Sequence, residues 1–538
     1  MSGKKLLLPA AGAAVLIAGG AAGYWYLKGP AIDGTTPLAL AKTIPDEAYM
    51  AAFISSDLQS WAKLQQFGTP EAKQVVAKGL QNLDQDLMSK NNINFDKDIR
   101  PWIGNGMVAL MPGEKGTEQP NVLAVFNIRD KISAMQFAGK LASQGGKSKE
   151  TDYKGNKVLV SEDGKTHATV IKDFLMVASD QKTIEAAINT NQGEASLASK
   201  PNAESVFSKS VEVKNAIAYV YFPDYAGAIQ NFMNVSADTA EIPPVNMKQL
   251  KQVQSMVAGI GVEDEGLRMK AAVTMSPDAP KFNYQPVPGK VISLFPADAL
   301  AMFSGGNISQ IWSQASEQAK ADPTTEQALN TMRDSAKAVN FDLDKDVFSW
   351  MNGEFGMALI PSDRGILAQV GFGGVLVFDT SDRKTAEATL AKLDNLAQSN
   401  SMLVQQRDVQ GKKVTEWSSP MVPGALVGHG WLDDDSVFLA LGGPMVDVIT
   451  TKPGQSIESS ANFKASTSNL PKQNLGYLYL DMDKTMTLVN RFAAMSQSPI
   501  PPESAAVLNS IKGIGMTSTQ VNSSIGEMDM LLALKKSK

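Results

Sequence analysis

Short apolar runs alternate with stretches of helical periodicity along most of the chain. Residues 122–126 and 375–378 are apolar runs of strand length, and each is followed by apolar residues at helical spacing, over 132–141 and 386–397. Two further runs, 157–161 and 167–171, are separated by a polar turn sequence that is typical of an antiparallel hairpin. The pattern predicts an α+β protein built on a mainly antiparallel sheet with helices.

The same pattern occurs twice. The segment Ile44-Pro45-Asp46 has a counterpart in Phe295-Pro296-Ala297, and Asp96-Lys97-Asp98 before Trp102 has a counterpart in Asp344-Lys345-Asp346 before Trp350. Further matches follow in the same order, including Tyr219-Val220-Tyr221 with Tyr477-Leu478-Tyr479 and Gly259-Ile260-Gly261 with Gly513-Ile514-Gly515. A repeat of about 250 residues is too long for a solenoid and indicates two tandem homologous domains.

The N-terminus has the pattern of a membrane segment. Lys4 and Lys5 precede an uncharged stretch over residues 6–27, which ends in aromatic residues and is followed by Lys28. This length spans a bilayer as a helix, and the positive charges before it favour a cytoplasmic N-terminus. The pattern predicts a single transmembrane helix with the bulk of the chain outside the cytoplasm, and a cleaved signal peptide is the alternative.

These signals divide the chain into five parts. We expect an N-terminal membrane anchor over residues 1–28, a tether over 29–43, a first domain over 44–275, a linker over 276–290 and a second domain over 291–535. The linker is rich in proline and has no apolar periodicity. The predicted fold class is therefore α+β, with an N-terminal transmembrane helix followed by two tandem homologous domains.

Composition excludes several kinds of chemistry. The 538 residues include no Cys and two His, with 50 Lys+Arg against 55 Asp+Glu. Thiolate metal sites, disulfides and cysteine nucleophiles are excluded, and nucleic acid is not an expected partner because the net charge is −5. We expect no cofactor and no metal.

Candidate chemical groups have simpler structural interpretations. His167 and His429 each precede an apolar strand at nearly the same distance, which makes them look like one position inherited twice. Asp342, Asp344 and Asp346 alternate like calcium ligands, but the glycine and glutamate that an EF-hand loop requires are missing. No catalytic residue is assigned, and we expect a protein that is not an enzyme.

Two proline-containing loops are the candidate contact sites. Ile242-Pro243-Pro244 and Ile500-Pro501-Pro502 occupy corresponding positions, and each interrupts a predicted helix pair with apolar residues nearby. Such a hairpin either packs internally or contacts a membrane or a partner protein. We name these six residues, Ile242, Pro243, Pro244, Ile500, Pro501 and Pro502, as the candidate contact.

The chain resembles a known bacterial family. The N-terminal anchor, the Pro45-Asp46 opening, the segment from Asp96 to Trp102 and the Tyr153-Lys154-Gly155 turn together look like a family of unknown function whose members are membrane-anchored, exported and mainly cyanobacterial. The resemblance implies a duplicated α+β domain in the plasma or thylakoid membrane, with the bulk of the chain periplasmic or lumenal. It implies no catalytic residues.

These observations lead to a function hypothesis with two alternatives. We expect a single-pass membrane-anchored extracytoplasmic or lumenal protein that binds or scaffolds another membrane or exported protein, with the membrane itself contacted through residues 6–27. One alternative is an envelope- or lipid-directed hydrolase whose acid and base are carboxylates. The other is a protein that binds a small apolar ligand or lipid.

Overall fold

The computed structural model describes residues 35–537 apart from 88–93, 114–119, 144–148, 163, 201–202, 204–210, 237–249, 282, 321 and 497. The chain divides into two compact units. The first comprises Met1–Ala279 with Val521–Met528 and Leu534–Lys538, and the second comprises Pro280–Gln520 with Asp529–Ala533. The chain thus passes from one unit to the other inside the proline-rich segment 276–290, while the homology of the two halves stays a prediction.

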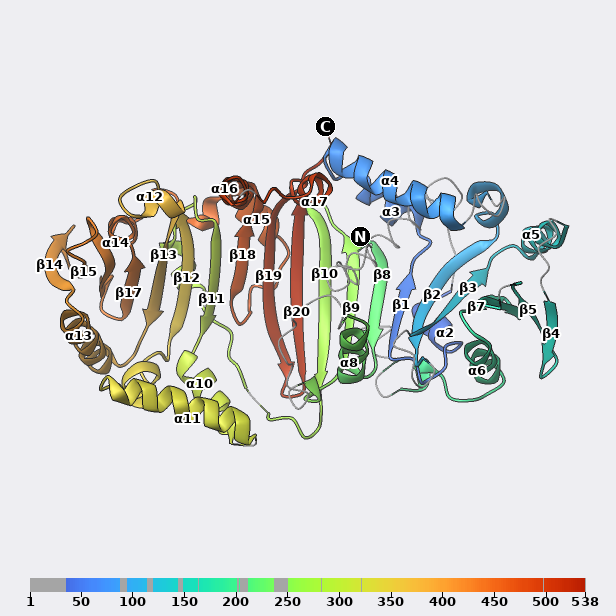
Figure 1. Ribbon diagram of the computed structural model, residues 1–538, viewed down its shortest axis with the longest axis horizontal. Coiled ribbons are helices and arrows are strands. Elements are labelled where there is room, and N and C mark those ends of the chain that lie inside the picture. The colour runs from blue at the N-terminus through green and yellow to red at the C-terminus, as the bar shows by residue number, and fades with distance from the viewer. Residues whose placement is uncertain are drawn as a thin grey trace. The chain divides into compact units, whose positions relative to one another are not determined.

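The first unit is an antiparallel sheet with helices. Its strands are β1 (Met50–Ile54), β2 (Ile103–Met111), β3 (Asn121–Ile128), β4 (Lys149–Tyr153), β5 (Asn156–Val160), β6 (His167–Ile171), β7 (Phe174–Ala178), β8 (Ala216–Phe222), β9 (Val253–Val262) and β10 (Gly266–Met275). Its helices are α2 (Pro37–Ala41), α3 (Leu58–Leu64), α4 (Pro70–Leu87), η2 (Phe95–Ile99), α5 (Lys131–Ser143), α6 (Gln181–Asn191), η3 (Leu197–Ser199) and α8 (Tyr225–Ser236). The strands pair in the order β4-β5-β6-β7-β3-β2-β1-β8-β9-β10 (Figure 1).

The second unit repeats this order of elements. Its strands are β11 (Ala301–Gly306), β12 (Glu354–Pro361), β13 (Phe372–Asp379), β14 (Leu403–Val409), β15 (Lys412–Ser418), β16 (Ala425–Trp431), β17 (Ser436–Leu441), β18 (Tyr477–Asp481) and β19 (Ile511–Asn522), and β20 (Ile525–Leu534) has residues in both units. Its helices are η4 (Lys290–Leu294), α10 (Ile308–Ala319), α11 (Pro323–Ala338), η5 (Leu343–Phe348), α12 (Leu367–Val370), α13 (Arg383–Ser399), α14 (Gly443–Thr450), η6 (Ile457–Ser459), α15 (Ala461–Thr467), α16 (Met482–Met495) and α17 (Pro502–Leu508). The strands pair in the order β14-β15-β16-β17-β13-β12-β11-β18-β19. This matches, strand for strand, the order β4-β5-β6-β7-β3-β2-β1-β8-β9 of the first unit.

Local sequence signals explain several of these elements. Helix α6 begins after Asp180, whose carboxylate accepts hydrogen bonds from the backbone N–H and the hydroxyl of Thr183. The predicted hairpin over 157–171 is confirmed, because β5 and β6 pair antiparallel with Val160 opposite His167. Capping and strand alternation thus determine these local structures.

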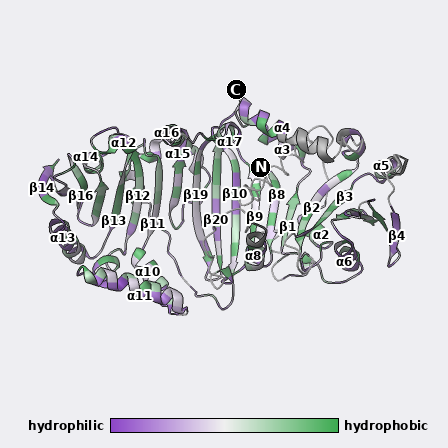
Figure 2. Ribbon diagram, in the orientation of Figure 1, coloured by the Kyte–Doolittle hydropathy of each residue, from purple (hydrophilic) through white to green (hydrophobic). Residues whose placement is uncertain are grey.

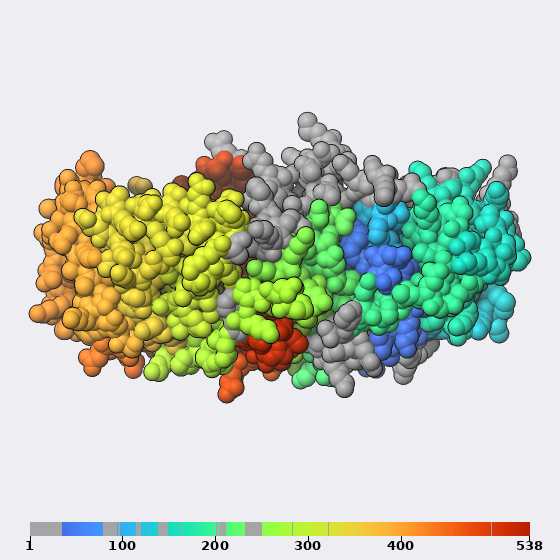
Figure 3. All heavy atoms as spheres, turned by 90° about the horizontal axis from the view of Figure 1, so that it is seen from below, coloured from blue at the N-terminus to red at the C-terminus, as the bar shows by residue number. Residues whose placement is uncertain are grey.

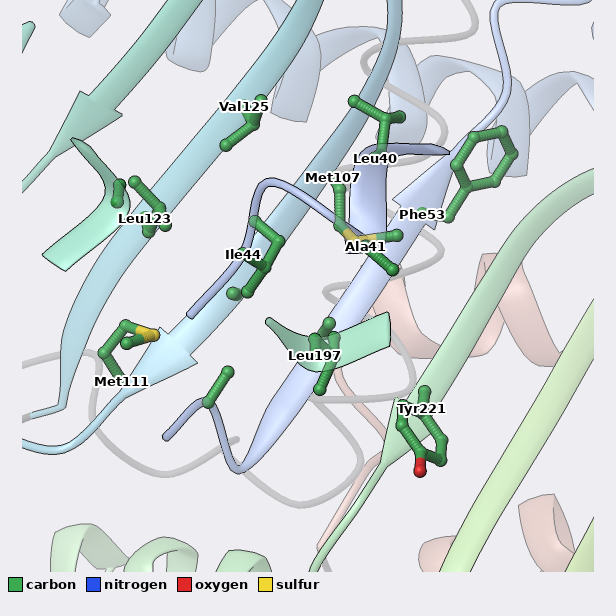
Figure 4. Close-up of a cluster of buried hydrophobic side chains, with 14 of the residues drawn as sticks. Leu40, Ala41, Ile44, Phe53, Met107, Met111, Leu123, Val125, Leu197 and Tyr221 are labelled. Carbon is green, nitrogen blue, oxygen red and sulfur yellow. The ribbon is translucent and has the colours of Figure 1, made fainter. Parts of the chain in front are cut away.

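Each unit has its own core on one face of its sheet. In the first unit Leu40, Ile44, Met107 and Leu123 are completely buried, and they bring α2 against β2 and β3 (Figure 4). In the second unit the core contains Val375, Val377, Phe438 and Ala440 from β13 and β17, packed with residues of η4 and α14. Burial of these side chains is the main source of stability in both units.

The fold class predicted from the sequence is corrected in one respect. Among the residues described, no helix is long and apolar enough to cross a membrane. The longest of them, α4, has 18 residues and carries charged residues from Glu71 to Asp86, which hydrocarbon does not accommodate. The transmembrane helix is therefore removed from the fold class, which is α+β with antiparallel sheets. The predicted anchor, 1–28, and residues 29–34 of the predicted tether lie outside the described residues.

The repeated tryptophans lie in equivalent settings. Trp102 follows the π-helical turn η2, and its indole N–H donates to the carbonyl oxygen of Asp98 at 2.6 Å. Trp350 follows η5 in the same way, with its indole N–H 3.0 Å from the carbonyl oxygen of Asp346. Both rings are almost completely buried, so each fixes a π-helical turn to its sheet.

Candidate functional site

The predicted contact residues are described for the second unit alone. Ile242, Pro243 and Pro244 lie outside the described residues. Ile500 is half-buried, and Pro501 and Pro502 are exposed between α16 and α17. Pro502 occupies the first turn of α17, where its missing N–H costs no hydrogen bond.

Helix α16 has one face held by the second unit and one face exposed. Met482 and Met486 are buried, and Arg491 donates to the carbonyl oxygen of Ala368 at 2.8 Å. Three apolar side chains three positions apart on this helix are partly exposed: Val489 is 36% exposed, Phe492 38% and Met495 64%. Val507 on α17 is 43% exposed.

These exposed residues define the hairpin surface, which consists of Val489, Phe492, Met495, Val507 and the loop Ile500–Pro502. The sequence pattern identified the loop and the presence of apolar residues near it, which include Phe492 and Met495. It did not identify Val489 or Val507, although the spacing of Val489, Phe492 and Met495 was a usable signal.

A buried carboxyl group, Glu354, and a half-buried one, Asp379, are neighbours at the start of β12 and the end of β13. The backbone N–H of Gly353 donates to the carbonyl oxygen of Asp379 at 3.1 Å, which sets Glu354 next to Asp379. Glu354 accepts from the backbone N–H of Lys290 at 2.9 Å, and Asp379 accepts from the hydroxyl of Ser436 at 2.7 Å. Burial raises the pKa of both carboxyl groups, and the charge of Asp379 raises the pKa of Glu354 further.

The contacts of this pair account for its position without a reaction. Glu354 fixes the start of η4, and Asn105 makes the corresponding link in the first unit, where its amide donates to the carbonyl oxygen of Thr35 at 2.7 Å. Asn127 near the end of β3 takes the place that Asp379 has at the end of β13. Asn127 pairs with a residue of β7, and Asp379 pairs with Ser436 of β17. The same two positions therefore hold amides in one unit and carboxyl groups in the other.

Replacing Glu354 by glutamine is expected to change how stability depends on pH. Because its pKa is raised in the folded state, wild-type Glu354 contributes stability that is complete below the unfolded pKa of about 4.3 and is lost as pH rises through the folded pKa. Glu354→Gln has no proton to lose and avoids this loss. The free energy of unfolding of the variant, relative to that of wild type, should therefore increase between pH 4 and pH 7. Urea denaturation at several pH values measures this, and the exposed-site variant Glu503→Gln is the control. A difference that does not vary with pH would contradict the assignment.

The two histidines point to opposite faces of their sheets. His167 and the core residue Leu123 both pair with Ala178, so His167 points to the core face of the first sheet. His429 pairs with Leu439, which packs on the opposite face of the second sheet. A shift of one residue in a strand reverses the side-chain direction, so the interpretation of one inherited position is wrong. The Nε2 atom of His429 lies 2.8 Å from Asp394. Trp417 donates to the same carboxylate at 2.6 Å, so Asp394 of α13 joins two side chains of the sheet in a partly buried polar cluster.

The alternating aspartates form structural bonds. Asp342 caps η5, Asp344 pairs with Arg333 at 2.8 Å, and Asp346 pairs with Lys392 at 2.6 Å. Across the ranges that the structure describes, no group of three or more His, Cys, Asp or Glu residues is placed to hold a metal ion. The partners of these aspartates explain the pattern as helix capping and ion pairing.

The fold and the exposed surface define a protein of two antiparallel α+β units with an apolar helical hairpin on the second. The chain belongs to a family described as "Protein of unknown function (DUF3352)", whose profile matches residues 10–534. This confirms the resemblance to a family of unknown function. Its mainly cyanobacterial distribution and the duplicated domain stay predictions.

Comparison with other proteins adds no function. No curated protein matches the chain. Among solved structures, crystal forms III, I and IV of TP0453 are similar to it at 10% sequence identity, with TM-scores of 0.27, 0.26 and 0.27. They cover 47%, 47% and 46% of this chain and 83%, 82% and 88% of their own. At TM-scores this low, the similarity supports no conclusion about fold or function.

Proposed function

We propose that the protein is an exported binding or scaffold protein that contacts a membrane or exported partner through the hairpin surface. The observation that carries this proposal is the row of exposed apolar side chains on α16, where Phe492 is 38% and Met495 is 64% exposed. Apolar side chains at helical spacing normally face a core, so a row of them in solvent suits a surface that is covered in a complex.

The geometry of the hairpin suits binding. Each Å² of apolar surface removed from water contributes about 25 cal/mol, so covering Val489, Phe492 and Met495 would supply a substantial part of a binding energy. The proline pair Pro501-Pro502 limits the conformations of the connecting loop, which reduces the entropy lost on association. Arg491 holds α16 to the unit, so the surface is presented on a fixed element.

The location is part of the proposal. The charges and the apolar stretch of the first 28 residues are typical of an export signal, which would place both units in the periplasm or a lumen. We also propose that the two units descend from one duplicated domain, because their strands pair in the same order. On that basis Ile242–Pro244 is the sequence counterpart of Ile500–Pro502.

The hydrolase alternative gains no support from the buried carboxyl pair. Each group accepts a hydrogen bond, although Oε1 of the buried Glu354 has no partner among the described residues, and the first unit has amides in their places. We therefore propose a binding protein and not an enzyme.

The experiment is cross-linking and affinity purification of the tagged full chain from cells lysed in mild detergent. A partner should be recovered with wild type and reduced at least fivefold with Phe492→Ser/Met495→Ser. The control is Met332→Ser on α11, which removes a methionine that is 55% exposed elsewhere on the second unit. Figure 3 shows the surface of this part of the chain in yellow. No partner, or equal recovery with both variants, would contradict the proposal.

A further inference from the structure

The three methionines of α16 differ in their exposure to solvent. Met482 and Met486 are buried, at 6% and 5% exposed. Met495, the last residue of the helix, is 64% exposed and belongs to the hairpin surface. A reagent in solution therefore reaches the side chain of Met495, whereas the fold shields the other two.

The composition makes methionine the side chain that an oxidant modifies most readily. The 538 residues include 25 Met and no Cys, so no thiol is present to react first. The thioether sulfur takes one oxygen atom from hydrogen peroxide: the S–O bond forms as the O–O bond breaks, the sulfur loses two electrons, and the peroxide leaves as water. The product, methionine sulfoxide, is polar and is reduced back by methionine sulfoxide reductases.

Oxidation of Met495 changes the hairpin surface itself. Phe492 lies one turn before Met495 on α16, and under the proposed function a partner covers both side chains. A thioether suits that burial, whereas the oxygen of a sulfoxide is an acceptor that needs a donor. The side chains of Val489, Phe492 and Val507 have no donor to offer. Covering a sulfoxide among them would therefore bury an unpaired polar group, which opposes binding.

We propose that Met495 is a redox switch of the hairpin surface: its thioether permits the partner to bind, and its oxidation to the sulfoxide by a peroxide prevents binding. This inference rests on the proposed function and specifies its regulation. The switch acts on the free protein, because a bound partner covers the sulfur. Met482 and Met486 stay reduced because they are buried, so the fold that presents α16 is unchanged.

Peptide mapping by mass spectrometry, after treatment of the full chain with hydrogen peroxide, measures the first step. Met495 should be converted to the sulfoxide at least fivefold faster than Met486, while the circular dichroism spectrum stays that of the untreated chain. Met332 is the exposed control, 55% exposed on α11, where Figure 2 shows hydrophilic and hydrophobic residues side by side. It should be oxidised about as fast as Met495. Equal rates for Met495 and Met486 would contradict the switch.

Partner recovery before and after oxidation measures the second step. The treated full chain is freed of peroxide with catalase and mixed with a mild-detergent extract of untreated membranes, and each protein is compared with its own untreated sample. Recovery should fall at least fivefold for wild type and for Met332→Leu, and methionine sulfoxide reductases should restore it. For Met495→Leu, whose side chain has a similar volume and forms no sulfoxide, recovery should change by less than twofold.

Several outcomes would overturn the switch. They are undiminished recovery by wild type with Met495 oxidised, an equal loss for Met495→Leu and wild type, and a loss that the reductases do not reverse. If recovery by the untreated chain depends on Phe492 and Met495 but survives oxidation, the switch fails and the proposed function stands. If the untreated chain recovers no partner, or no more than Phe492→Ser/Met495→Ser does, both fail.

Discussion

Replacing Trp350 by alanine is expected to lower the free energy of unfolding of the second unit by about 3–5 kcal/mol. The side chain is 2% exposed and packs with Phe378, Leu390 and Val437. Its loss leaves a large cavity and removes the hydrogen bond from the indole to Asp346, which holds the π-helical turn η5. Both effects act in the same direction.

Urea denaturation followed by circular dichroism, together with hydrogen exchange of β13 and β17, measures this loss. Phe492→Ala is the matched control, because it truncates an exposed aromatic ring and should change stability by no more than about 0.5 kcal/mol. Trp102→Ala should produce the same kind of loss in the first unit, where the centroid of the indole ring lies 5.6 Å from that of the Phe137 ring. Equal stability of Trp350→Ala and Phe492→Ala would show that the repeated tryptophan does not fix the turn.

Local structure could be predicted from the sequence where a short pattern decides it. The cap at Asp180, the hairpin over 157–171 and the tryptophan after each Asp-Lys-Asp segment all depend on neighbouring residues. Hydrogen bonding within a few positions determines such elements before any long-range packing forms. The repeated pattern also predicted that Trp102 and Trp350 take corresponding positions in the two units.

Features that depend on strand register could not be predicted in this way. His167 and His429 precede their apolar strands by seven and eight residues, but this spacing does not show that they point to opposite faces, because the pairing register decides it. The carboxyl pair joins Glu354 to Asp379 across two strands, so no local motif contains it. Phe303, Met357 and Leu478 lie on three strands that are far apart in sequence, and only the strand pairing shows that these side chains share a face.

The structure explains why the Gly-Ile-Gly segment occurs in both units. Gly515 of β19 lies so close to α15 that an added Cβ atom would overlap the backbone carbonyl group of Ser466. Gly261 of β9 has the same relation to the carbonyl oxygen of Lys214 in the first unit. In both units, a glycine without a side chain allows another segment of the chain to approach the strand closely.

Gly515→Ala is therefore expected to destabilise the second unit by about 3 kcal/mol or more, at the upper end of the cost of overpacking. The group that must move is backbone, which cannot rotate away as a flexible side chain would. Gly261→Ala should have a similar effect on the first unit. Gly454→Ala is the control, because a Cβ atom there meets nothing within 4 Å, and it should be neutral.

Thermal and urea denaturation of the three variants decide between a packing role and a merely conformational one. A packing role predicts a large loss for Gly515→Ala and Gly261→Ala, together with faster hydrogen exchange in β19 and β9 respectively. If both variants were as stable as Gly454→Ala, the close approach would not be required. A loss of stability confined to one unit would show that the close approach to the strand requires glycine in that unit alone, although the two Gly-Ile-Gly segments match in sequence.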